Sequence, residues 1–201
     1  MLNLNDDTIK SEGGSFDSSK IFGYSVVKDN VITDTLEGAV IVGFSQGISQ
    51  TGSKFWDIQM KDGNGNENNM REYDVDMTRD GWEKKQASQL KRLKHILSKF
   101  VPAGTALPQA ATFPELWTAI EGLMVANQCN TKPVRLKLVY NNKGYLIVPA
   151  YVPFMESMTV VKAQSSLKLN PEFDTLTRPS ADKPADKMVA SGGSSDIPFV
   201  F

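Results

Sequence analysis

The spacing of hydrophobic residues changes twice along the chain, and this constrains the fold more than any other feature. Up to Met77, apolar and polar residues alternate with the period of two that is typical of β-strands. From Trp82 to Phe100 the apolar residues recur every three or four positions, as in an amphipathic helix, and alternation returns after Pro133. The sequence therefore predicts strands, then a helical insert, then strands again, in a mainly β fold of the α+β class.

Three strands are predicted before the helical insert. Residues 38–48 are rich in β-branched side chains, and residues 54–60 alternate after a Thr-Gly-Ser turn. Residues 70–77 alternate after a dense Asp-Gly-Asn-Gly-Asn turn cluster. The second of these strands is expected to place Phe55 on the face opposite to a buried face that contains Trp56.

Two helices and a hairpin are predicted to follow. The first helix spans 83–100, and the second begins at Pro114, which suits the first turn of a helix. Strands at 133–140 and 145–148 flank the turn Asn-Asn-Lys-Gly. Three strands, a helical insert and a two-stranded hairpin form the element order of a five-stranded oligonucleotide/oligosaccharide-binding (OB) barrel.

The chain of 201 residues is expected to form one domain between two flexible ends. Residues 1–20 are rich in Ser, Gly, Asp and Asn and predict a flexible N-terminal arm. Residues 21–162 form the expected OB-like domain. Residues 163–201 are rich in Ser, Asp, Lys, Pro and Gly, which predicts a disordered tail that carries an apolar tip.

Charge is distributed unevenly along the chain, although the formal net charge is only −1. Residues 1–80 carry 7 basic and 14 acidic side chains, whereas residues 82–162 carry 11 and 4. A cationic face beside an anionic one suits a polyanionic partner, and two solvated faces are the alternative explanation. No apolar run is long enough to span a membrane, and a single cysteine, Cys129, excludes an internal disulfide, so an intracellular protein is expected.

Single-stranded nucleic acid requires cations for its phosphates and flat side chains on which unpaired bases stack. The predicted strands, their hairpin and the first helix supply both kinds of residue. The candidate nucleic-acid-binding residues are Lys54, Phe55, Arg71, Tyr73, Arg135, Lys137, Tyr140, Lys143, Tyr145, Lys91 and Lys94. Trp56 and Trp117 are expected in the core instead, and His95, the only histidine, at a surface or boundary position.

An enzyme is a weaker interpretation of the same residues. The acidic side chains Asp57, Glu72, Asp74 and Asp76 could gather a divalent metal for a nuclease, but solvated acidic strand edges explain them more simply. One His and one Cys cannot build a zinc site, and no Gly-rich phosphate loop is present. We therefore expect no catalytic residues, no metal and no cofactor.

The residues Asp196, Ile197, Pro198 and Phe199, with Phe201 beyond them, form the apolar tip. Asp-Ile-Pro-Phe resembles the C-terminal tip of bacterial single-stranded-DNA-binding proteins, although Val200 and Phe201 follow it here. With the Tyr-Leu-Ile-Val-Pro run inside 133–154, the chain as a whole resembles a bacteriophage single-stranded-DNA-binding protein.

This resemblance implies an OB-fold protein that binds and protects single-stranded DNA with little sequence preference during phage replication and recombination. It also implies a cytoplasmic location in the infected host cell, and replication or recombination proteins that dock on the tip. A homo-oligomer is possible because single barrels often need neighbours along a strand. The alternative is a non-enzymatic viral structural or assembly protein that uses the tip as its docking peptide, and the third class is the metal-dependent nuclease.

Overall fold

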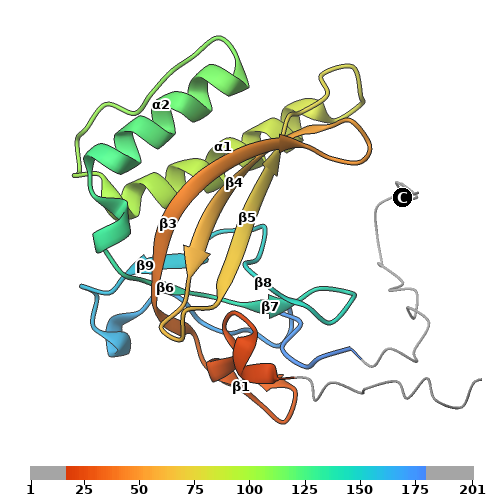
Figure 1. Cartoon of the computed structure of the whole chain (residues 1–201), viewed down its shortest axis with the longest axis vertical. Coiled ribbons are helices and arrows are strands. Elements are labelled where there is room, and N and C mark those ends of the chain that lie inside the picture. The colour runs from red at the N-terminus through yellow and green to blue at the C-terminus, as the bar shows by residue number, and fades with distance from the viewer. Residues whose placement is uncertain (1–16, 180–201) are drawn as a thin grey trace, which may run out of the picture.

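A five-stranded antiparallel sheet organises the computed structural model, which describes residues 17–179. In spatial order its strands are β5 (Glu67–Tyr73), β4 (Lys54–Lys61), β3 (Leu36–Ile48), β6 (Val134–Leu136) and β9 (Met155–Ser157). The long strand β3 pairs with β6 at its start and with β4 over the rest, with a register shift at Ile41 to Gly43. Figure 1 shows β3 curving across the molecule, so that its two halves belong to different parts of the sheet.

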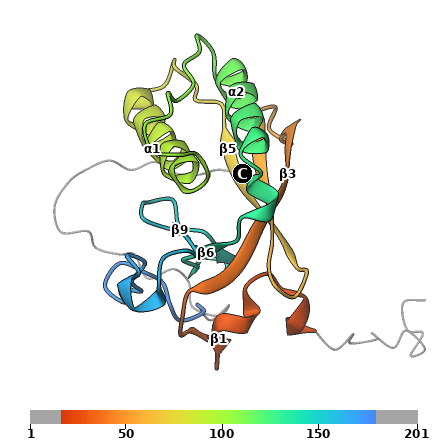
Figure 2. The ribbon, with the colours of Figure 1, turned by 90° about the vertical axis from the view of Figure 1, so that its left-hand side faces the viewer.

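Two helices connect β5 to β6 and cover one face of the sheet (Figure 2). They are α1 (Trp82–Phe100) and α2 (Phe113–Ala126). Thr112 and Glu115 cap the start of α2 reciprocally, and Pro114 occupies its first turn, where a missing N–H costs nothing. The predicted helical insert between the third and fourth strands of the sheet is therefore confirmed.

The core lies between the sheet and the helices. Trp56 on β4 meets Trp117 on α2 and Phe113 at its start, with ring centroids 6.4 Å and 4.8 Å apart. Ile58 and Met60 lie on the same face of β4 as Trp56 and are also buried. The predicted alternation of this strand is confirmed, because residues two apart share a face.

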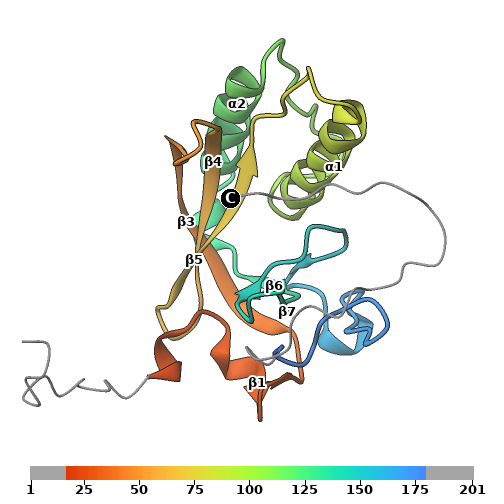
Figure 3. The same cartoon turned by 90° about the vertical axis from the view of Figure 1, so that its right-hand side faces the viewer.

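Shorter elements surround the sheet. Two further two-stranded sheets pair β1 (Val27–Lys28) with β2 (Val31–Ile32) and β7 (Val139–Tyr140) with β8 (Leu146–Ile147). The 3₁₀ helices are η1 (Ser18–Lys20), η2 (Tyr24–Val26), η3 (Cys129–Thr131) and η4 (Lys162–Gln164). Figure 3 shows α1 and the β7–β8 segment on the same side of β5.

Helix α1 joins the two outer strands of the sheet, β5 and β9, which do not pair with each other. Gln89 Nε2 donates to the carbonyl oxygen of Tyr73 on β5 at 2.8 Å. On the other side, the backbone N–H groups of Phe154 and Met155 donate to His95 Nε2 at 3.3 Å and 3.2 Å. Within residues 17–179 the sheet is therefore not closed into a barrel, and side chains of α1 satisfy backbone groups at both of its edges.

The predictions for the last two strands of the sheet are partly wrong. Residues 145–148 do not join the main sheet, because β8 pairs with β7 in a separate hairpin. The fifth strand of the sheet is β9, a three-residue segment that pairs with β6. The third strand also lies earlier than the predicted 70–77, since β5 ends at Tyr73.

The folded domain extends beyond the predicted boundary at residue 162. Leu167 is buried, and Thr177 forms a β-bridge with Val31. Residues 163–179 were predicted to belong to the disordered tail, but they pack on the domain. Residues 1–16 and 180–201, which include the rest of the predicted arm and the whole predicted tip with Asp196 and Phe199, lie outside the described residues.

Candidate nucleic-acid interface

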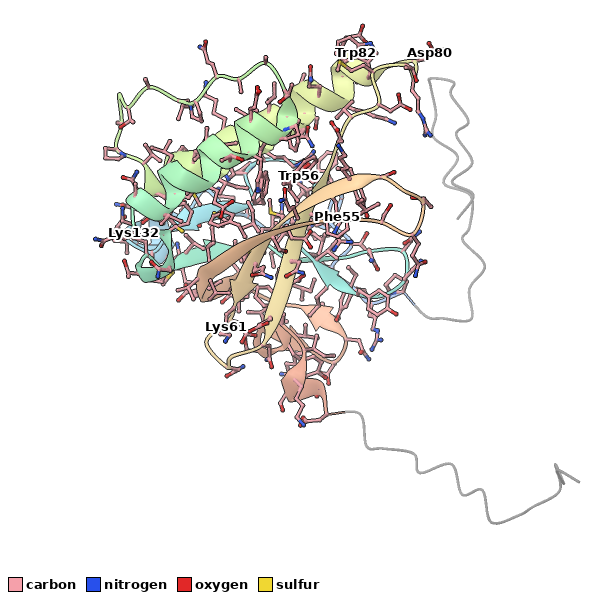
Figure 4. All side chains as sticks on the ribbon, turned by 45° about the horizontal axis from the view of Figure 1, so that its top comes forward. Phe55, Trp56, Lys61, Asp80, Trp82 and Lys132 are labelled. Carbon is pink, nitrogen blue, oxygen red and sulfur yellow. The ribbon has the colours of Figure 1, made fainter. Side chains whose placement is uncertain are left out.

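The face of β4 and β5 that points away from the helices carries an aromatic and basic surface. The register pairs Phe55 with Tyr73 and Asp57 with Arg71. Figure 4 labels Phe55 and its neighbour Trp56, which lie on opposite faces of β4. Tyr73 is 45% exposed, so a flat ring on this face is open to solvent. We call Phe55, Arg71 and Tyr73, with Asp57 beneath them, the aromatic row.

Arg71 is held in the aromatic row by contacts with two residues. Its Nε and Nη2 donate to the two carboxylate oxygens of Asp57 at 2.8 Å and 2.7 Å. Its guanidinium carbon lies 3.6 Å from the centre of the Phe55 ring. The hydrogen bonds to Asp57 raise the pKa of Arg71 above its usual value, so the cation is permanent. A fixed planar guanidinium beside an exposed ring offers a flat surface on which bases can stack.

Two glycines on β3 leave room for side chains of β4, one of them in the aromatic row. Gly47 lies opposite Phe55, and a Cβ atom on it would come within 2.6 Å of the Phe55 ring. Gly43 lies opposite Gln59, and a Cβ atom there would come within 2.7 Å of the Gln59 side-chain oxygen. The side chains of Phe55 and Gln59 on β4 therefore lie across the two glycines of β3.

A hollow of about 530 Å³ adjoins the aromatic row at the end of β5. It lies between β5, the connection to α1 and the first half of α1. Its lining residues are Ser53, Arg71, Glu72, Tyr73, Asp74, Val75, Asp76, Arg79, Lys85, Ser88, Gln89 and Arg92. A second hollow of about 230 Å³ shares Arg71, Glu72 and Arg92 with it and continues to residues 147–150. The two hollows therefore share part of their lining along the edge strand β5.

Several predicted binding residues are exposed. Lys54 lies at the start of β4 and directly precedes Phe55 in the chain. Lys91 and Lys94 are exposed on α1, and Lys143 is exposed between β7 and β8. Tyr145 is 63% exposed on the same hairpin. These side chains are exposed, and Lys54 is the one that neighbours a residue of the aromatic row along the chain, although its side chain leaves β4 on the opposite face.

Three other predicted binding residues are buried, so their assignment to the interface is wrong. Arg135 is only 2% exposed, and its guanidinium forms ion pairs with Glu156 at 2.8 Å and Glu37 at 3.1 Å. Lys137 is 6% exposed and pairs with Asp174 at 2.7 Å.

Tyr140 is buried in the small cluster that also contains Ile32 and Leu146. Burial raises the pKa of its hydroxyl. The physical reason is common to all three residues: segment 134–140 runs through the interior and is covered on both sides, so alternation along it does not mark a solvent face.

The acidic residues considered for a metal site have other partners. Asp57 binds Arg71, Glu72 binds Arg92 at 2.7 Å, and Asp76 binds Thr78 and Arg79. Asp74 is exposed. Over residues 17–179, no three His, Cys, Asp or Glu side chains cluster in a way that could hold a metal ion. Three of these four carboxylates, those of Asp57, Glu72 and Asp76, therefore form ion pairs with arginine side chains.

Sequence reasoning missed Gln89 and Arg92. Both lie on the face of α1 that meets β5, and both line the hollow. Their spacing of three residues was the available signal, because positions i and i+3 share a helix face. The sequence does not show that this face meets a strand edge.

None of the helices in the described part of the chain is long and apolar enough to cross a membrane. Comparison of the whole chain with protein-family models, with curated proteins and with solved structures found no match. The aromatic row and the hollow beside it are therefore the features of the molecule that bear on its function.

Proposed function

We propose that this protein binds single-stranded DNA with little sequence preference and protects it, as phage single-stranded-DNA-binding proteins do in replication and recombination. One observation carries the proposal: the solvent face of β4 and β5 holds Arg71 flat against Phe55, beside the exposed ring of Tyr73. Stacking on such side chains stabilises binding by about 1–3 kcal/mol per base and tolerates any base.

The order of the strands supports an open variant of the OB fold. In chain order, the strands of the main sheet are β3, β4, β5, β6 and β9, with the helices between the third and the fourth. OB folds are five-stranded, partly open barrels that bind oligonucleotides on the face of their second and third strands. Here these are β4 and β5, the two strands that carry the aromatic row. We propose that α1 occupies the position at which such a barrel would close.

The proposed mechanism is passive. Bases stack on the aromatic row, and Lys54 at the start of β4 neutralises a phosphate, so that exposed bases are kept from pairing and from nucleases. Because a large part of the affinity is electrostatic, it falls as salt rises. We further propose that the tip, residues 196–201, recruits replication or recombination proteins in the host cytoplasm.

Fluorescence anisotropy with labelled oligonucleotides tests this function. Single-stranded DNA, duplex DNA and RNA are titrated over a range of salt concentrations with the full chain. We expect binding to single-stranded DNA that strengthens with oligonucleotide length and weakens with salt. Tyr73→Leu should lower the affinity by about 1–3 kcal/mol, whereas Phe173→Leu, an exposed aromatic outside the row, should not.

A matched pair of lysines tests the electrostatic part. Lys54→Gln should reduce the slope of affinity against salt by about 1, as expected for one lost phosphate contact. Lys28→Gln changes an exposed lysine on β1 and should leave the slope unchanged. Absence of any salt-sensitive binding to single strands would reject the proposal in favour of an assembly protein, and metal-dependent cleavage of the oligonucleotide would favour the nuclease.

A further inference from the structure

Strand β5 has an open edge. It pairs with β4 alone, and Figure 1 shows it as the outermost strand on its side of the sheet. A hollow of about 470 Å³ is lined by residues of β5 alone, namely Glu67, Asn68, Asn69 and Arg71. The second hollow, of about 230 Å³, lies between β5 and residues 147–150. The space next to residues 67–71 of this edge is therefore open.

The register shows which backbone groups of β5 point outward. The backbone N–H of Asp74 donates to the carbonyl oxygen of Lys54 at 3.0 Å, at the end of the β4–β5 ladder. Antiparallel strands alternate between hydrogen-bonded and non-hydrogen-bonded pairs, so the even-numbered residues of β5 bond to β4. The N–H and C=O groups of Glu67, Asn69 and Arg71 therefore point away from β4. Within residues 17–179 these groups form no hydrogen bond with another segment.

The sequence of this edge is complementary to itself. When two copies of β5 lie antiparallel about Asn69, the outward groups of one copy meet those of the other, and each Glu67 lies directly opposite an Arg71. The overlap ends before Tyr73, whose carbonyl oxygen already accepts a hydrogen bond from Gln89. Opposite charges in cross-strand pairs are stabilising, whereas pairing centred on Glu67 or on Arg71 would place like charges opposite each other. The charges therefore favour one register.

Ion pairs within each copy extend this charge pattern. Glu67 pairs with Lys61 on β4 at 3.1 Å, and Arg71 pairs with Asp57 on β4 at 2.7 Å. All four side chains lie on the face that carries the aromatic row, because each is an even number of residues from Phe55 or Tyr73 on its own strand. Across two paired edges, Lys61 and Glu67 of one copy are followed by Arg71 and Asp57 of the other. The charges then alternate in sign across four strands.

We propose that β5 is a self-association edge: two copies of the chain pair through residues 67–71, about a two-fold axis at Asn69. The interface is isologous, because the same surface of each copy contacts itself, and it joins the two five-stranded sheets into one. The two-fold axis of an antiparallel strand pair is perpendicular to the sheet, so both aromatic rows lie on the same face of the dimer. Pairing also closes the edge to other strands. The association requires no nucleic acid, so its test is independent of the proposed function.

Disulfide formation at the two-fold axis tests the register. In a hydrogen-bonded antiparallel pair the Cα atoms are about 5.5 Å apart, a distance that a disulfide can span. Oxidation of full-length Asn69→Cys should therefore give a linked dimer of twice the monomer mass of 22.1 kDa on a non-reducing gel. Asn64→Cys, in the exposed turn before β5 and away from the axis, should give none, and the buried Cys129 is common to both variants. Equal linking by the two variants, or linking by neither, would refute this pairing.

Sedimentation velocity of the full chain without nucleic acid measures the association itself. The wild type should shift from monomer toward dimer as its concentration rises. Asn69→Pro and Asn69→Ala both remove the amide side chain, but only proline removes the outward N–H, a loss that the fold of an edge strand tolerates. Asn69→Pro should stay monomeric at concentrations at which the wild type and Asn69→Ala are dimeric.

A charge variant tests the complementarity of the edge. Glu67→Gln should weaken dimerisation about two- to thirtyfold, because the two-fold axis removes two opposite-charge pairs at once. A wild type that stays monomeric at every concentration would overturn the proposal, and so would a dimer that persists in Asn69→Pro. The cysteine variants keep the proposal testable even if Asn69→Pro does not fold.

Discussion

Protonation of His95 is expected to destabilise the fold. Its Nε2 atom accepts hydrogen bonds from the backbone N–H groups of Phe154 and Met155, and a proton on that nitrogen would face two donors. Burial, with a smaller contribution from the charge of Lys99, lowers the pKa of His95 from 6.5 to about 4. The folded protein therefore holds the imidazole neutral at a pH at which the unfolded chain already protonates it.

The size of the effect follows from the difference between the two pKa values. Each pKa unit corresponds to about 1.36 kcal/mol, so a fall from 6.5 to about 4 corresponds to about 3 kcal/mol at most. The ring is only partly buried, and solvent screening reduces the figure to about 2–3 kcal/mol. Because the folded-state pKa is depressed, this stability is fully present above pH 6.5 and is lost as the pH falls toward 4. Domains are stable by only about 5–15 kcal/mol, so the loss is a large fraction.

Urea denaturation followed by tryptophan fluorescence at pH 7.5 and pH 4.5 measures this loss. Carboxylates also titrate in this range, so His95→Gln is the reference: its side-chain oxygen can accept a hydrogen bond but does not titrate. Lys99 and the nearby Glu156 are present in both proteins and cancel in the comparison. The wild type should lose about 2 kcal/mol more than His95→Gln on acidification. Parallel losses in the two proteins would refute the reasoning.

Three further outcomes are expected. Gly47→Ala should displace the Phe55 ring and weaken single-strand binding severalfold at little cost in stability. Gly63→Ala, whose added methyl group would meet no atom, should change neither binding nor stability. Titrations and melting curves of both variants measure the two effects. Arg135→Ala should destabilise the fold by about 3–5 kcal/mol in denaturation experiments, because it leaves a buried glutamate unpaired. Under the proposed metal-free binding, single-strand binding should persist in EDTA and in Asp74→Ala; loss of binding on chelation would contradict this.

Local alternation was sufficient to predict the strand that carries the site. In β4 the side chains of Trp56 and Ile58 point to one face, and those of Phe55 and Asp57 point to the other. The turn before the strand marks the residue at which β4 begins. The two helices were also predictable, because Pro114 suits the first turn of α2 and α1 has a long apolar stripe. Such signals are contained within a few neighbouring residues.

The errors came from features that depend on distant parts of the chain. Arg135 and Lys137 alternate with apolar neighbours, but their carboxylate partners come from segments that the sequence does not show to be close. β9 spans only three residues, too few for a periodic pattern. Residues 163–179 have a polar composition, yet they pack through a few contacts such as Leu167.

The bonds from α1 to both edges of the sheet restrict how this protein can change. Gln89, Arg92 and His95 are spaced by three residues, so all three point from one side of the helix toward β5 and β9. An insertion of one residue between them would rotate part of this set by about 100° and leave one outer strand without its partner. Insertions or deletions should therefore be tolerated in the connection 101–112, which follows the three contacts. They should not be tolerated between Gln89 and His95, because that part of α1 contacts both outer strands.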